Sequence, residues 1–191
     1  MGLYLTLVRV PADRLSHIVD DPHAWYDLEV EIEGLWSEEH GRVSTEALGT
    51  AALHKTWDAL RFLLDPALRA GSSSDDFGPT TLSSAAVWGA HAVSESFLEA
   101  LDENGFTMFD RPPRHNTATE VPEIVSALEN VSIDRLLDVH ARALEAAQSY
   151  AYGGRPLQDA DRASLQSGFE VARRLYAEAK RREQAVAVLL R

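Results

Sequence analysis

The sequence predicts an α+β fold, in which a small central sheet includes the N- and C-terminal strands and several helices pack around it. Two apolar runs, at residues 3–8 and 185–190, carry no charge and many bulky or branched side chains, as in strands buried on both faces. Between them lie amphipathic helices, which need a shared core. A length of 191 residues suits one sizeable core, so we expect a single domain over 1–191.

Turn residues and apolar spacing predict three helices in the first third of the chain. A short helix follows the turn at 11–13, and a second helix over 25–35 has an acidic, exposed face. The third can be capped by Ser44 or Thr45 and is terminated at residues 65–66. Its apolar residues recur at helical spacing: Leu53, Trp57, Leu60 and Leu64.

The middle of the chain is less regular. Residues 70–79 are small, polar or turn-forming without periodicity, which is typical of a flexible surface loop. We expect short helices over 83–88 and 94–101 and a short aromatic strand over 106–109.

Three further helices are expected before the last strand. Thr117 and Glu120 have the spacing of a capping box, and Pro122 fixes the start of the helix that follows. Ser132 opens the next helix. The last helix is the longest and has the clearest apolar stripe: Leu165, Phe169, Ala172, Tyr176 and Ala179.

The chain is strongly acidic. It has 18 basic and 30 acidic side chains, a formal net charge of −12 and a pI near 4.9. The densest basic run, over 173–182, is interleaved with glutamates on a predicted helix, as on a solvated helical face. We therefore expect no nucleic-acid binding and no binding to an anionic membrane, because both require a basic face.

Several classes of site are excluded by what the chain lacks. It has no cysteine, and hence no disulfide, thiolate zinc site or cysteine nucleophile. A basic n-region and a cleavage site are missing from its apolar start, and no apolar run is long enough to cross a bilayer. We expect a cytoplasmic protein. Since no glycine-rich phosphate loop, nucleophile elbow or HExxH helix occurs, we expect no cofactor and no metal.

Three histidine or arginine groupings remain as candidates for chemistry. His54 and Asp58 lie one helical turn apart beside Trp57, so their side chains could orient each other as an acid/base pair. An exposed contact on the helix surface is the commoner outcome for such a pair. His140 shares an apolar helix face with Leu137, which favours a neutral imidazole hydrogen-bonded in the core.

The third grouping is the cationic segment 110–116, expected as a loop after the aromatic strand. It carries the guanidinium groups of Arg111 and Arg114 and the imidazole of His115. Such loops collect ligand groups, and paired arginines suit a carboxylate or phosphate. A stiff connection whose arginines pair with surface acids is the alternative. Tyr152, before two glycines, either lines the same cleft or marks a helix terminus.

Four segments in this order resemble the YfbM-like family of bacterial proteins, a domain of unknown function with the number 1877. They are the opening strand with its short helix, the helix over 53–64, the helical stretch ending at 150–154, and the long last helix leading into residues 185–190. The Lys55-Thr56-Trp57-Asp58-Ala59-Leu60 pattern is the most specific. The resemblance covers nearly the whole chain and implies an α+β fold and a bacterial, cytoplasmic setting, without an established activity, cofactor or catalytic residue.

The chain departs from this family pattern at three places. Arg61 stands where members of the family often carry a histidine, and neither the insertion at 71–79 nor the segment 111–114 matches the pattern. A site built on these segments would be peculiar to this chain.

For function, we expect a non-catalytic binding or protein-interaction module, because the chain is acidic and lacks a catalytic signature. One version is an immunity-like protein that neutralises a basic partner. The alternative is a small enzyme that acts on an anionic metabolite through an Arg/His-lined cleft, and a homodimer is a third possibility; whether the chain is an enzyme stays open. The candidate binding residues are His54, Trp57, Asp58, Arg61, Arg111, Arg114, His115 and Tyr152.

Overall fold

The computed structural model describes residues 5–38, 49–71, 78–93, 113–147, 152 and 154–190. Several sequence predictions lie outside these described residues: the helix cap at Ser44 or Thr45, most of the loop over 70–79, the helix over 94–101, the strand over 106–109, and Arg111.

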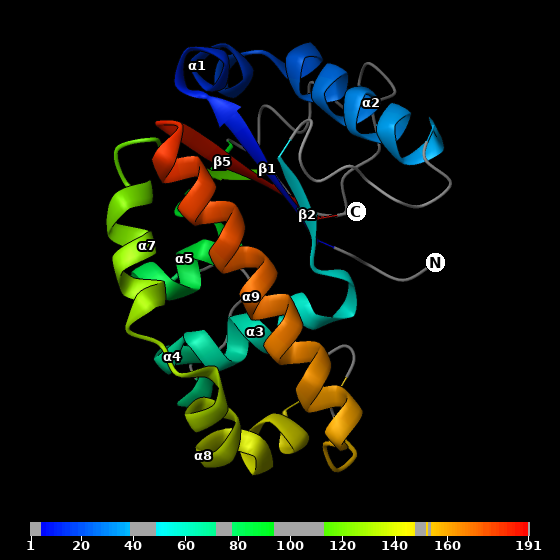
Figure 1. Ribbon diagram of the computed structural model, residues 1–191, viewed down its shortest axis with the longest axis vertical. Helices are drawn as coiled ribbons and strands as arrows, with labels where there is room; N and C mark the ends of the chain where they lie inside the picture. Colours follow the sequence, from blue (N-terminus) through cyan, green and yellow to red (C-terminus); the bar gives the residue numbers. More distant parts are fainter. Residues whose placement is uncertain are drawn as a thin grey trace.

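The centre of the fold is a five-stranded antiparallel sheet in the order β2-β1-β5-β4-β3. Strand β1 (Leu5–Pro11) lies beside β5 (Gln184–Leu190) along its whole length (Figure 1), with Leu5 opposite Leu190. Residues 5–10 and 185–190 are all buried. The prediction that both ends of the chain supply interior strands is therefore confirmed.

Three short strands complete the sheet. β2 (Thr50–Ala52) pairs with β1 at one edge, β4 (Arg114–Asn116) pairs with β5, and β3 (His91–Ala92) pairs with β4 at the other edge. The outer strands of this sheet therefore come from three separate parts of the chain.

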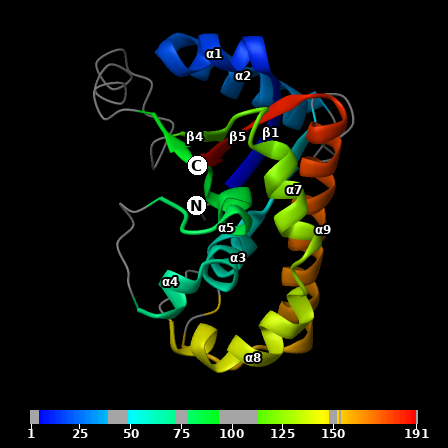
Figure 2. The same cartoon turned by 90° about the vertical axis from the view of Figure 1, so that its left-hand side faces the viewer.

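Helices cover both faces of the sheet (Figure 2). On one face lie α1 (Ala12–Asp20) and α2 (Pro22–Glu38), whose buried residues include Ile18 and Trp25. Both helices were predicted, but the acidic face of α2 is not exposed throughout as expected, because Glu29 is only 1% exposed. Because successive residues of a strand point to opposite faces, Val8 and Val10 join this smaller cluster, whereas Leu5 and Leu7 join the larger cluster on the other face.

The larger face carries the remaining helices. α7 (Val121–Glu129) and α9 (Asp159–Arg181) run away from the sheet, and α8 (Ile133–Ala146) lies at the end of the molecule opposite the sheet (Figure 1). The predicted stripe of α9 is buried, and Ser132 caps α8 by accepting a hydrogen bond from the backbone N–H of Arg135. Within the described residues, no helix combines the length and apolarity needed to span a membrane.

Asp65 fixes the chain after α3 (Trp57–Leu64). Its buried carboxylate caps α4 (Pro66–Arg69) by accepting from the N–H of Ala67, and it also accepts from the N–H and hydroxyl of Thr80. Burial raises the pKa of this carboxyl, but hydrogen bonds from Thr80, Ser84 and Ala67 outweigh burial and hold the pKa below its usual value. Asp65 thus joins the end of α3 to the start of α5 (Leu82–Trp88).

The helix predicted to contain both Leu53 and Leu64 is too long at its N-terminal side. Residues 50–52 form β2, residues 54–56 form the short 3-10 helix η1, and α3 begins only at Trp57. The N–H of Leu53 donates to the carbonyl of Leu5 at 2.8 Å. Pairing with the edge of β1 therefore wins over the helical spacing of the apolar residues, because tertiary contacts override local propensity.

Candidate functional site

An aromatic and cationic stack joins α3 to α5. The rings of Trp57 and Trp88 stack with their centroids 5.6 Å and their planes 13° apart. Arg61 follows Trp57 by one helical turn, on the same face of α3. Its guanidinium carbon lies 3.8 Å from the centre of the Trp88 ring, within the range of a cation–π attraction. All three side chains are buried.

A second cation, Arg114, reaches the same indole from β4. Its guanidinium carbon lies 6.0 Å from the centre of the Trp88 ring, and its Nε donates to the carbonyl of Gly89 at 3.0 Å. Gly89 has a φ of +73°, and a Cβ at this position would lie 2.7 Å from the Cβ of Arg114. A glycine directly after α5 therefore allows β4 to bring Arg114 to Trp88.

The charge of Arg114 is unfavourably placed. Burial lowers the pKa of its guanidinium, and the positive charge of Arg61 lowers that pKa further. In the part of the chain that the structure describes, Arg114 forms no ion pair with an acidic side chain, and its acceptors are the carbonyls of Gly89 and Ala90. The charge of Arg61 repels that of Arg114, and an anion bound beside Arg114 would offset this repulsion.

Hydrogen-bond donors also exceed acceptors at the stack. The indole N–H groups of Trp57 and Trp88 are buried, and neither has an acceptor among the described residues. A buried donor without an acceptor costs about 1–3 kcal/mol. The stack therefore combines hydrogen-bond donors with positive charges, and an anionic group that accepts hydrogen bonds would be favoured beside it.

Asn116 holds β4, and with it Arg114, against the helices. Its Nδ2 donates to the carbonyl of Ala85 at 2.8 Å and to the hydroxyl of Tyr176 at 2.6 Å, and its Oδ1 accepts from the N–H of Ala90 at 2.8 Å. Asn116 is fully buried, and burial raises the pKa of the Tyr176 hydroxyl. No local pattern points to this asparagine, because its partners lie 31 and 60 residues away in sequence.

Arg114 and His115 do not face one common cleft. The segment 114–116 was predicted to be a loop, but it is a strand of the sheet. Arg114 lies opposite Val188 of the larger cluster, whereas His115 lies opposite Ala187 of the smaller one. Neighbouring residues of a strand point in opposite directions, so the two side chains lie on opposite faces of the sheet.

His115 belongs to a group of titratable side chains at β3 and β4. Its ring centre lies 5.1 Å from that of His91, whose Nε2 lies 2.7 Å from a carboxylate oxygen of Glu120. Burial lowers the pKa of His115 to about 4; the charge of His91 contributes to this, and Glu120 opposes it. The ring therefore stays neutral at pH 7. His115 also lines a shallow hollow of about 360 Å³ beside α1.

We expect His115 to make the stability of the protein depend on pH. Its pKa is about 4 in the folded state, whereas an unperturbed imidazole has a pKa of 6.5, so between these values the unfolded state binds the extra proton. The contribution of neutral His115 to the free energy of unfolding is therefore fully present above pH 6.5. It is lost as the pH falls towards 4, and the total loss is about 3 kcal/mol. Chemical denaturation at several pH values gives the slope of the free energy of unfolding against pH. In His115→Gln the part of this slope that lies between pH 4 and 6.5 should be missing.

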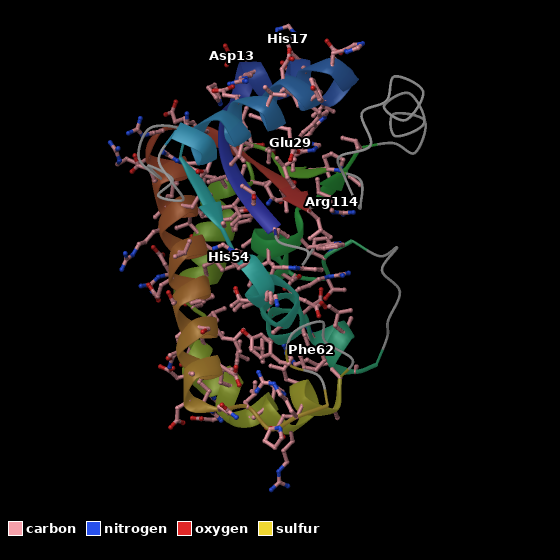
Figure 3. All side chains as sticks on the ribbon, turned by 90° about the vertical axis from the view of Figure 1, so that its right-hand side faces the viewer. Asp13, His17, Glu29, His54, Phe62 and Arg114 are labelled. Atoms are coloured by element: carbon pink, nitrogen blue, oxygen red, sulfur yellow. The ribbon has the colours of Figure 1, made fainter. Side chains whose placement is uncertain are left out.

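The control for this experiment is His17→Gln. His17 is an exposed histidine that points away from α1 (Figure 3), so His17→Gln is the same substitution at a histidine outside the core. Carboxyl groups titrate in all three proteins, so the difference from the unmodified chain isolates His115. Equal slopes between pH 4 and 6.5 for the His115→Gln variant and the unmodified chain would contradict the assignment.

The remaining described residues singled out in the sequence come from η1, the first turn of α3, the α8–α9 connection and α8. Exposed His54 lies in η1 with a φ of 36°, and Asp58 lies in the first turn of α3; Figure 3 shows His54 on η1 and Arg114 beside the sheet. Tyr152 is buried in the α8–α9 connection, 5.8 Å from the guanidinium carbon of Arg155. His140 was predicted to lie in the core, but it is partly exposed.

Thus Trp57, Arg61 and Arg114 are the predicted candidates that the structure brings together, and the residue on which they meet, Trp88, was not among the candidates. In the sequence, Trp88 is only the last residue of a predicted helix. That position does not indicate that a guanidinium group lies on its ring. Within the described ranges, no group of three or more histidine and acidic side chains could hold a metal ion.

Comparisons with known proteins identify the fold but no activity. A family model described as "Domain of unknown function (DUF1877)" matches residues 1–189. The crystal structure of a protein of unknown function, YfbM from Escherichia coli, is similar over 98% of this chain and 99% of its own, with a TM-score of 0.65 and 14% sequence identity. At that identity the likeness shows a shared fold alone. No match was found among curated proteins.

Proposed function

We propose that this chain, which belongs to the DUF1877 family, is a non-catalytic binding module that recognises an anionic group through Arg61 and Arg114 at the Trp88 ring. The observation that carries the proposal is the meeting of two guanidinium groups on one indole, where Arg114 has no acidic partner among the described residues.

The chemistry of the site favours a carboxylate or a phosphate. A guanidinium group donates two parallel hydrogen bonds to either anion, and such charge-assisted bonds are stronger than neutral ones. Low solvent exposure around Arg61 strengthens the attraction further. Trp88 itself is 5% exposed, with the Trp57 ring stacked on it and the Arg61 guanidinium over it, so the anion meets the guanidinium groups rather than the face of the indole. A carboxylate is our preferred ligand class, and benzoate is the probe for it.

The surroundings of the anion support binding rather than catalysis. Within the described part of the chain, the Trp88 ring is contacted by the indole of Trp57 and two guanidinium groups, and Arg114 donates to backbone carbonyls. None of these groups transfers protons readily at neutral pH. The neighbouring imidazole, His115, lies on the opposite face of the sheet.

The positive charge of the site also distinguishes between the two kinds of binding partner, a basic protein and a small anion. An immunity-like role needs a face that attracts a basic protein, whereas this site is cationic and suits an anionic ligand. We therefore favour a small anion over a basic protein partner. A cytoplasmic setting is part of the proposal, and the absence of cysteine is compatible with it.

The test is a titration with benzoate and with inorganic phosphate. A ligand that binds only the folded state raises the melting temperature by mass action, and binding beside Trp57 and Trp88 should change the tryptophan fluorescence. We expect benzoate to produce both effects. In Arg114→Gln we expect its affinity to fall at least about tenfold, which corresponds to about 1.4 kcal/mol.

A matched control removes the same charge elsewhere. Arg135 is exposed on α8, at the end of the molecule opposite the sheet (Figure 1), and Arg135→Gln should bind benzoate as the unmodified chain does. The proposal fails if neither anion shifts the melting temperature of the unmodified chain. It also fails if Arg114→Gln and Arg135→Gln respond alike.

A further inference from the structure

A second hollow lies between β1, the edge strand β2 and α9. It is at the edge of the sheet opposite to the one formed by β3. Its volume is about 420 Å³, and its charged lining comes from Arg9, Arg174 and Glu178. Strand order separates it from the Trp88 site, because β2 is one edge of the sheet and β4 lies next to the other. It is therefore independent of the function proposed above.

Arg9 is the buried cation of this hollow. Its guanidinium group occupies the space beside Gly49, where a Cβ would lie 2.0 Å from Nε, and Gly49 has a φ of +64°. The position therefore requires glycine. Among the described residues, the two polar side chains that Arg9 contacts are both distant: NH1 lies 3.4 Å from the amide oxygen of Gln184 and 3.4 Å from a carboxylate oxygen of Glu178. Arg9 keeps donor capacity for a further acceptor.

Glu178 does not neutralise the hollow by itself. Its carboxylate pairs with Arg181 and Arg182 at 2.5 Å each, in addition to Arg9. These two arginines hold the pKa of Glu178 down to about 2. The lining residues carry two arginines and one glutamate, a net charge of +1, in a chain whose formal net charge is −12.

Apolar walls complete the hollow. Thr50 contributes its backbone alone, because it lies opposite Val8 and its side chain therefore points to the other face of the sheet. The remaining walls come from Ala51, Val171 and Leu175. A net charge of +1 matches a monoanion, and apolar walls match an apolar body.

We infer that this hollow binds a small monocarboxylate with an apolar body, whose carboxylate accepts hydrogen bonds from Arg9 and Arg174 while its body packs on Val171 and Leu175. Burial and the charges of Arg182 and Arg181 lower the pKa of Arg9, and Glu178 opposes them. An added anion relieves this repulsion, and it supplies the acceptor that the guanidinium of Arg9 lacks at short range.

The test uses hexanoate as the probe and hexanol as its uncharged counterpart. Binding is followed by the amide resonances of Gly49, Thr50 and Ala51, which report this hollow and not the Trp88 site. The titration is made in the Arg114→Gln background, so that failure here and failure of the proposed function are distinguishable. We expect hexanoate to shift these resonances in the millimolar range or below, and hexanol to bind at least about tenfold more weakly.

Two exposed neighbours on α9 provide the matched variants. Arg174 lines the hollow, whereas Arg173 does not and pairs with Glu170 at 2.7 Å. Arg174→Gln should weaken hexanoate binding about tenfold, and Arg173→Gln less than about twofold. The inference is overturned if hexanoate leaves these resonances unmoved, if hexanol binds equally well, or if the two variants have the same affinity.

Discussion

Gly89→Ala should lower the free energy of unfolding by about 4 kcal/mol. Gly89 has a φ of 73° and a ψ of 136°, a combination that is essentially confined to glycine and costs other residues about 1–3 kcal/mol. The new Cβ would also lie 2.7 Å from the Cβ of Arg114 and 3.0 Å from the backbone nitrogen of His115. These atoms belong to a sheet strand and cannot move aside cheaply. Urea denaturation measures the change.

Gly71→Ala separates the two causes. Gly71 also has a positive φ, +79°, but a Cβ there would meet no atom of the described residues within 4 Å. We therefore expect Gly71→Ala to lose the backbone preference alone, about 1 kcal/mol. If both variants lose the same stability, the close approach of β4 to residue 89 is not what makes glycine necessary. If Gly89→Ala has the same free energy of unfolding as the unmodified chain, glycine at residue 89 is not what allows Arg114 to reach Trp88.

Asn116→Ala should cost a similar amount, about 4 kcal/mol. The change leaves the N–H of Ala90 and the hydroxyl of Tyr176 without the partner they have in the folded protein, and each buried unpaired group costs about 1–3 kcal/mol. The carbonyl of Ala85 keeps its hydrogen bond from the N–H of Gly89 and contributes less. The loss of side-chain packing adds to the total. The measurement is again the free energy of unfolding in urea.

Asn130→Ala is the control for this second prediction. Asn130 is exposed, and its Nδ2 donates to the carbonyl of Ser126 at 2.8 Å, so water can replace the contact. We expect a change within about 0.5 kcal/mol. A loss below about 1 kcal/mol for Asn116→Ala would show that β4 is held by the sheet alone. The link from Asn116 to α5 and α9 would then have no part in positioning Arg114.

Long, regular elements were predictable because their signal is local. The stripe of α9 repeats over many turns, and the runs that form β1 and β5 are uniformly apolar, so each element reveals its burial without knowledge of its neighbours. β2 and β4 have three residues each. That length shows no periodicity, and pairing with β1 or β5 alone makes these segments strands.

The candidate site was predictable only in part. Trp57 and Arg61 share a helix face, and Arg114 follows two prolines in a cationic segment. The sequence alone therefore identified these three residues as candidates. Their meeting point on Trp88 and the support from Asn116 depend on contacts between distant segments. The shared cleft predicted for Arg114 and His115 was wrong because strand geometry, not sequence distance, sets the direction of a side chain.

The sequence by itself determined the α+β class, the two interior strands from the ends of the chain, the long last helix and the negative net charge, since apolar spacing and charge are properties of each segment alone. Only the tertiary structure decided which face Arg114 and His115 occupy, and which cations share a ring or a hollow. The physical reason is that like charges are brought together only when the burial of a whole core stabilises the fold that holds them.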